Sequence, residues 1–232
     1  MLGLALLALV GSVTGHYGWS GFTADSVLKV NTAVLSVCIA SLLLLDSCGR
    51  SLPAVRHAVA LLVVGVAAVT LLQDVTGVSL GLDQLLLVDG SGTPGVPGRP
   101  APSTSVALIA FGVALLLSPR SMVAHGLVLG SFSLGGLAVL GYLYDAPGLY
   151  GISGYTAMSL NTSLVLAASA VAFLAAHPDA GLAALVTDTG VAGQWVRGAL
   201  PAVLLGPALL GWVRLHGQRA GLFGTEYGLA LM

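Results

Sequence analysis

The stretch AVRHAVALLVVGVAAVTLL, residues 54–72, decides the fold class. After Arg56 and His57 it carries no ionisable side chain, and its length is close to the ~20 residues that a helix needs to cross ~30 Å of hydrocarbon. Apolar and polar positions do not alternate along it, as they would in the strands of a membrane barrel. The stretch therefore predicts a transmembrane α-helix.

The composition of the whole chain supports the same class. Of 232 residues, 56% are hydrophobic and only 7% are charged, against roughly 25% charged residues in an ordinary soluble domain. The formal net charge of -1 excludes a nucleic-acid-binding surface, because such a surface requires a basic face. The two cysteines, Cys38 and Cys48, supply neither a disulfide framework nor a redox motif.

Further apolar runs, bounded by charges, prolines or glycines, predict an all-α fold: a polytopic membrane bundle of seven to eight transmembrane helices built from repeated helical hairpins. We expect one integral membrane domain over residues 1–232. The predicted spans are residues 2–14, 30–45, 54–72, 105–117, 122–143, 158–176, 198–213 and an incomplete span at 222–232. Because the last run is about half as long as a crossing requires, we expect an output domain, if there is one, beyond residue 232.

The connections between these spans carry their own signals. Gly and Pro crowd residues 73–104, which predicts an irregular outer loop. Residues 181–186 predict a short amphipathic helix on the membrane surface, and Pro201 and Pro207 predict a kinked or locally opened helix. Basic residues in the shortest connections place the amino terminus inside. The arginines that support this orientation are Arg50, Arg56, Arg120 and Arg197; an equal number of basic residues falls outside, namely Lys29, Arg99, Arg214 and Arg219.

An internal repeat organises the chain. The pattern GWSG (18–21) followed by NTA (31–33) recurs as GLYG (148–151) followed by NTS (161–163). A weaker copy pairs GLD (81–83) with STS (103–105), and GLFG (221–224) opens a fourth. Each copy has polar residues just before its returning helix, at 31–32, 103–104 and 161–162, which we call the polar steps. Since each copy contains two crossings, these polar steps are expected on the same side of the membrane.

Two interpretations of these polar steps are open. In the first, Asn31, Ser103 and Asn161 only cap helices by accepting hydrogen bonds from free backbone N–H groups. In the second, the steps converge on a polar ligand pocket that opens to the outer leaflet. The candidate ligand-binding residues are Lys29, Asn31, Thr32, Ser103, Thr104, Asn161 and Thr162. Lys29, the only lysine, is expected either to reach lipid headgroups or to meet an anionic ligand.

No motif for nucleotide, zinc, hydrolase or thiol chemistry is present, so no catalytic residue and no metal site are predicted. His57, His125 and His177 fall at the predicted inner ends of helices, and two of them could serve as axial haem ligands. A structural role at the membrane interface is the alternative for each. The cofactor therefore stays unknown.

Several segments together resemble the amino-terminal multi-pass membrane module of bacterial sensor proteins, in which the module precedes PAS, histidine-kinase or diguanylate-cyclase domains. The segments are GVSLGLDQLL (77–86), GRPAPSTS (98–105), GYLY (141–144), YTAMSLNT (155–162), GWVRL (211–215) and GLFGTEYGLAL (221–231). The resemblance implies a role and assigns no site residue, and the output domain of that family is absent from this sequence.

Two functions follow as expectations. The first is a non-catalytic signal-input domain in the bacterial inner membrane, working as a homodimer or in a larger membrane assembly within the lipid bilayer. The second is an accessory structural subunit of a larger redox or photosynthetic membrane complex. A transporter ranks third, because the ionisable residues Asp46, Asp74, Asp145 and Glu226 lie at predicted span ends and not at the midplane.

Overall fold

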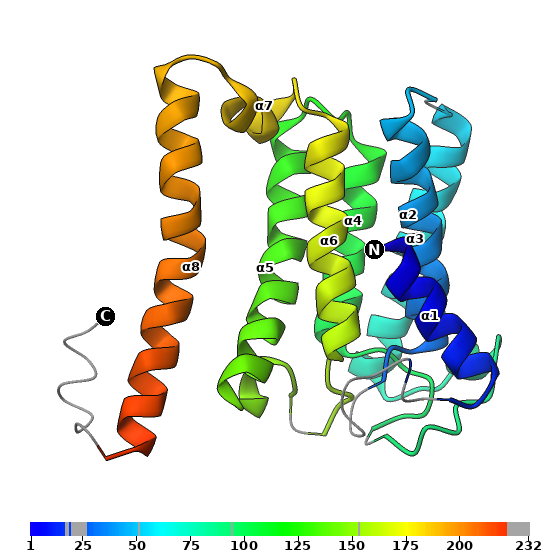
Figure 1. Cartoon of the computed structure of the whole chain (residues 1–232). Helices are drawn as coiled ribbons and strands as arrows, with labels where there is room; N and C mark the ends of the chain where they lie inside the picture. The colour runs from blue at the N-terminus through cyan, green and yellow to red at the C-terminus, as the bar shows by residue number, and fades with distance from the viewer. Residues whose placement is uncertain (17–18, 20–26, 51, 94, 153, 222–232) are drawn as a thin grey trace.

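The computed structural model describes residues 1–16, 19, 27–50, 52–93, 95–152 and 154–221, and this part of the chain is helical, without a β-strand (Figure 1). The α-helices in chain order are α1 (Leu2–Val13), α2 (Val30–Ser47), α3 (Pro53–Thr76), α4 (Pro102–Leu116), α5 (Met122–Tyr144), α6 (Leu160–Ala176), α7 (Gly181–Thr187) and α8 (Val191–Arg219). Two short 3-10 helices, η2 (Leu82–Gln84) and η3 (Pro147–Leu149), lie in the connections.

The all-α class is confirmed, but the number of seven to eight spans is not. Among the described residues, four helices are long and apolar enough to cross a membrane: α2, α3, α5 and α8. A fifth candidate joins α6 to α7 through a bend of 74°. With 12 and 15 residues, α1 and α4 extend only about 18 and 22 Å at 1.5 Å per residue, short of ~30 Å of hydrocarbon. The predicted span at 222–232 lies outside the described residues.

Helices α2 to α6 alternate in direction, so that α2, α4 and α6 begin at the end of the bundle where the long connection lies (Figure 1). We call this the loop end, and the end at which α3 and α5 begin the pocket end. Asn31, Thr104 and Asn161 therefore lie at the same end of the bundle, as the repeat predicts. The GWSG copy of the repeat falls largely, and the GLFG copy almost entirely, outside the described residues.

The core is built around α4, which packs against α3 and α5 and also contacts α6. Phe111 of α4 and Phe173 of α6 are fully buried and meet edge to face, with 6.2 Å between ring centroids. A glycine of α5 allows this helix to approach α6 closely. A Cβ added at Gly135 would lie 2.9 Å from the backbone oxygen of Ser163 in α6, so Gly135 is used for packing.

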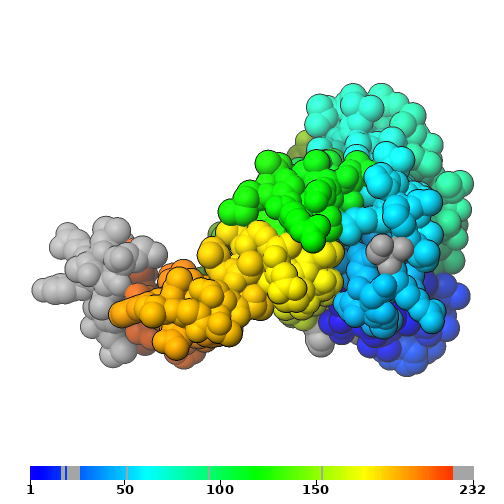
Figure 2. Space-filling view, turned by 90° about the horizontal axis from the view of Figure 1, so that it is seen from above, coloured from blue at the N-terminus to red at the C-terminus, as the bar shows by residue number. Residues whose placement is uncertain are grey.

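Helix α7 packs on the pocket end of the bundle, and α8 stands apart from it. Helix α7 forms where the amphipathic segment is predicted, and α8 continues from it at one side of the molecule (Figures 1 and 2). The predicted span 198–213 is too short, since α8 runs from Val191 to Arg219. The expected local opening is also wrong: α8 is one continuous helix that includes Pro201 and Pro207.

The close contact of α5 with α6 yields a prediction about stability. Gly135→Val places side-chain atoms against a backbone oxygen that cannot rotate away, so the free energy of unfolding is expected to fall by about 1–3 kcal/mol. Gly136→Val is the matched control, because an added Cβ there meets nothing within 4 Å and the change in helix propensity is the same. Reversible unfolding in mixed micelles measures both variants. Equal losses would contradict the packing role of Gly135.

Candidate functional site

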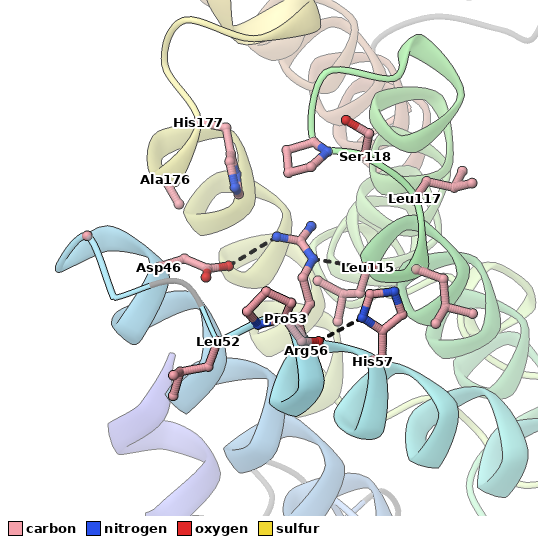
Figure 3. A pocket seen from close by; sticks show the side chains of 13 residues that line it. Asp46, Leu52, Pro53, Arg56, His57, Leu115, Leu117, Ser118, Ala176 and His177 are labelled. Atoms are coloured by element: carbon pink, nitrogen blue, oxygen red, sulfur yellow. Dashed lines mark hydrogen bonds and ion pairs between the residues drawn. The ribbon is translucent and has the colours of Figure 1, made fainter.

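A cavity of about 460 Å³ opens at the pocket end, between the end of α2, the start of α3, and the ends of α4 and α6 (Figure 3). Prolines shape its walls. Pro53 stands in the first turn of α3, where a missing N–H costs nothing, and Pro119 follows the end of α4. The lining residues are Asp46, Gly49, Leu52, Pro53, Arg56, His57, Leu115, Leu116, Leu117, Ser118, Pro119, Ala176 and His177.

Arg56 is the central polar side chain of this cavity, and only 13% of it is exposed. Its Nε donates to the carbonyl oxygen of Leu115 at 2.9 Å, which ties α3 to the end of α4. Its Nη1 pairs with the carboxylate of Asp46 at 3.3 Å. Its Nη2 is buried and has no hydrogen-bond partner in the described part of the chain. The guanidinium therefore retains donor capacity in the cavity wall.

His57 and His177 line the same cavity, on either side of Arg56 in the view of Figure 3. The Nδ1 of His57 lies 2.7 Å from the carbonyl oxygen of Pro53, and that of His177 lies 2.9 Å from the carbonyl oxygen of Phe173. Because a carbonyl oxygen only accepts, each Nδ1 is the donor, and a neutral ring then carries its lone pair on Nε2. Two of the three predicted haem-ligand candidates thus share one cavity.

His125 has a different environment. It is fully buried, and its Nε2 donates to the carbonyl oxygen of Pro119 at 2.8 Å, while its Nδ1 accepts from the backbone N–H of Leu182 at 3.2 Å. Both nitrogens are engaged, so the ring has no lone pair for haem iron. It fastens the start of α7 to α5, and Gly181 makes room for it, since an added Cβ would meet the ring at 2.5 Å.

The seven residues predicted to form a ligand pocket all lie at the loop end, at the starts of three helices. The helix caps are Lys29, Ala101 and Ser159. Among these, Ser159 is the one whose side chain accepts a hydrogen bond, from the backbone N–H of Thr162 at 3.1 Å. The predicted capping by Asn31, Ser103 and Asn161 is therefore wrong, because each stands one position inside its helix.

These side chains instead meet the long connection or stay among the helices. Asn31 donates from Nδ2 to the carbonyl oxygen of Leu82 at 3.0 Å. Thr32 and Asn161 are buried, and their Oγ1 and Oδ1 atoms have no hydrogen-bond partner among the described residues; Thr104 is buried as well, and Ser103 is half-buried. The space beside Lys29 is only about 10 Å³, room for one water molecule at most. The outer ligand pocket stays a prediction.

Lys29 is buried in an ion pair with Asp89 of the long connection, at 2.6 Å. Its side chain is 5% exposed, so it does not extend toward headgroups, contrary to one expectation. Burial alone would raise the pKa of Asp89, but hydrogen bonds from Lys29, from the side chain and backbone of Ser91 and from the backbone of Gly98 outweigh it and hold that pKa well below its usual range. The pair ties the long loop to the start of α2.

A second buried cluster fixes the same loop to α3. Arg99 donates through Nη2 to the carboxylate of Asp83 at 2.7 Å and through Nη1 to that of Asp74 at 3.3 Å. Gln73 also donates to Asp83, at 3.2 Å. Hydrogen bonding to Asp83 raises the pKa of Arg99. Sequence reasoning missed both clusters, although three acids and one arginine within an otherwise apolar chain signal such pairing.

Comparison of the chain with protein-family models, with curated proteins and with solved structures finds no match. The candidate site is therefore defined by geometry alone. The loop end is closed by ion pairs and the pocket end holds the open cavity.

The buried pair at the loop end predicts a pH-dependent loss of stability. Asp89→Asn leaves the Lys29 ammonium without its carboxylate, which typically costs about 3–5 kcal/mol. Because the folded state depresses the pKa of Asp89, the pair contributes fully above the unfolded value of about 3.9 and is lost as the pH falls below it. The difference between the wild type and the variant should thus be constant near neutrality and shrink below about pH 4.

Chemical unfolding at several pH values measures this difference. Asp179→Asn, at an exposed position of the pocket end, is the control and should change the free energy of unfolding by less than about 0.5 kcal/mol. A loss at Asp89 that does not depend on pH would contradict the ion-pair account.

Proposed function

We propose that this chain is a membrane-embedded signal-input domain of a bacterial signal-transduction protein in the inner membrane, non-catalytic in itself. The observation that carries the proposal is the attachment of α8. This helix has 29 residues and none of its most apolar 18-residue window is buried. A long helix that leaves a compact bundle and makes few contacts with it is suited to transmit a change of position.

Helix α8 contacts the rest of the molecule at its two ends and near Ala208 and Gly211. At its start, Arg197 donates to the carbonyl oxygens of Val186 and Asp188 at 2.6 and 2.7 Å. Farther along, the hydroxyl of Tyr144 donates to the carbonyl oxygen of Ala208 at 2.6 Å, and an added Cβ at Gly211 would lie 2.8 Å from that hydroxyl. Near its end, Arg219 donates to the carbonyl oxygen of Tyr144 at 3.1 Å.

The prolines of α8 make this helix easier to deform. Pro201 and Pro207 lack an N–H, so the carbonyl oxygens of Arg197 and Val203 do not receive the helical hydrogen bond. A signal that favours one position of α8 would shift the population between attached and detached states. In the proposed topology of seven to eight crossings, α2, α3, α5 and α8 span the bilayer, the shorter helices α1, α4 and α6 cross a locally thinner part of it, and α7 lies at the surface.

The resemblance of residues 77–231 to sensor modules supports this role, and the gene itself tests it. The reading frame downstream of the codon for Met232 should encode a PAS, histidine-kinase or diguanylate-cyclase sequence. A stop codon directly after Met232 would remove the proposed mechanism. Copurification with stoichiometric membrane partners would then favour the accessory-subunit function, for which the uncovered apolar face of α8 would be the docking surface.

Movement of α8 has a direct test at Tyr144. Tyr144→Phe removes a hydrogen bond worth about 0.5–1.5 kcal/mol, so the ratio of detached to attached α8 should rise about twofold to tenfold. Spin labels at Leu137 of α5 and Val203 of α8, both exposed, report the distance distribution in nanodiscs after Cys38 and Cys48 are replaced by Ser. Tyr155→Phe, in the exposed η3–α6 connection, is the control. Identical distance distributions for the wild type, Tyr144→Phe and Tyr155→Phe would contradict the proposed movement of α8.

A further inference from the structure

The cavity at the pocket end lies where lipid headgroups would meet the bundle. Its walls come from the last turns of α2, α4 and α6 and the first turn of α3, so it is located at a membrane interface if these helices cross the bilayer. Its lining combines apolar side chains, such as Leu52, Leu116 and Leu117, with polar ones. A site lined by both apolar and polar groups matches an amphipathic ligand.

The Nη2 atom of Arg56 is a hydrogen-bond donor that lacks an acceptor among the described residues. A buried donor without a partner is unfavourable, and more so when the group is charged. The guanidinium prefers anionic oxygens such as those of carboxylate or phosphate. Asp46 already occupies Nη1 at the long distance of 3.3 Å. Arg56 lines a cavity of about 460 Å³, so a rotation of its guanidinium, whose Nη2 is buried in the cavity wall, would bring this donor to a ligand oxygen.

The other polar groups of the cavity are hydrogen-bond acceptors and would bind a donor group of a ligand. When their rings carry one proton, His57 and His177 each have a lone pair on Nε2, because Nδ1 donates to a backbone carbonyl. Asp46 adds a carboxylate, and with Arg56 it makes the ionised groups of the lining neutral in sum. The matching ligand therefore carries an anionic oxygen and a cationic N–H group and has no net charge.

We propose that this cavity binds the headgroup of a zwitterionic aminophospholipid of the phosphatidylethanolamine type. The phosphate lies against Arg56, and the primary ammonium donates to Asp46 and to one of the two imidazoles, His57 or His177, that lie on either side of Arg56. Phosphatidylcholine carries the same phosphate and the same net charge but has no N–H group, so it is a sharp negative comparison. The inference goes beyond the signal-input role and does not depend on it.

Native mass spectrometry of the purified chain, titrated with dioleoyl lipids, tests the proposal. We expect phosphatidylethanolamine to bind about tenfold more tightly than phosphatidylcholine, the difference that one or two charge-assisted hydrogen bonds produce. The double substitution His57→Phe with His177→Phe keeps the rings, removes the lone pairs and leaves the Arg56–Asp46 pair intact. It should abolish most of the preference and leave phosphatidylcholine binding unchanged.

Two further variants complete the test. Arg56→Gln should weaken binding of both lipids about tenfold, because it removes the phosphate contact. His216→Phe, on α8 near the loop end, should change neither affinity. If Arg56→Gln does not fold, the double histidine variant still decides the question.

Three results would overturn the proposal. Equal affinities for phosphatidylethanolamine and phosphatidylcholine would remove the ammonium contact. Tighter binding of anionic phosphatidylglycerol than of phosphatidylethanolamine would contradict the requirement for a neutral ligand. If millimolar inorganic phosphate displaced the bound lipid and abolished the preference for phosphatidylethanolamine, the occupant would be a soluble anion and not a lipid.

Discussion

A hydrocarbon interior offers no hydrogen bonds, and this constraint shapes the whole chain. Every polar group within the bilayer must find its partner in the protein or move to a helix end. The chain follows both routes. Its few ionised side chains gather at the two ends of the bundle, where Lys29 pairs with Asp89, Arg99 with Asp83, and Arg56 with Asp46. The apolar helices between these layers pack through small residues such as Gly135.

The two ends differ in a way that suggests how the molecule works. At the loop end, ion pairs bind the long connection to α2 and α3, and only a space of about 10 Å³ is left beside Lys29. At the pocket end, the Arg56–Asp46 pair borders a cavity that has unused hydrogen-bonding capacity. Close to that end, His125 fastens α7, from which α8 departs. The cavity and the point from which α8 departs therefore lie near each other at the pocket end.

Sequence alone predicted the helices well and the polar contacts poorly, for a physical reason. Helix positions follow from local apolar runs, so the predicted spans 2–14, 30–45 and 122–143 agree with α1, α2 and α5 within a few residues. Helix α8 extends beyond its predicted span because Trp195 and Arg197 also suit a helix at the membrane surface. Asp89, the partner of Lys29, lies 60 residues away in the sequence, and Asp46, the partner of Arg56, lies 10 residues away in another helix, so the periodicity of a single helix identifies neither pair.

The haem-ligand and capping interpretations illustrate the same limit. Three histidines at helix ends looked equivalent in sequence, yet only His57 and His177 line the cavity, because His125 faces α7. Asn31 and Asn161 resembled caps because each precedes an apolar run, but each is the second residue of its helix, two positions after the cap. At that position the side chain turns from the free backbone N–H groups toward the bundle or the long connection.

The long connection and the α5–α6 connection are expected to share one face of the membrane, opposite the cavity. Impermeant maleimide labelling of single cysteines, in a background with Cys38 and Cys48 replaced by Ser, tests this arrangement most directly. The exposed positions Val88 and Asp145 represent the loop end, and Arg120 and Asp179 the pocket end. We predict that Val88 and Asp145 are labelled from one face only, and that Arg120 and Asp179 are labelled only from the other. Labelling of Val88 and Asp145 from opposite faces would contradict this arrangement.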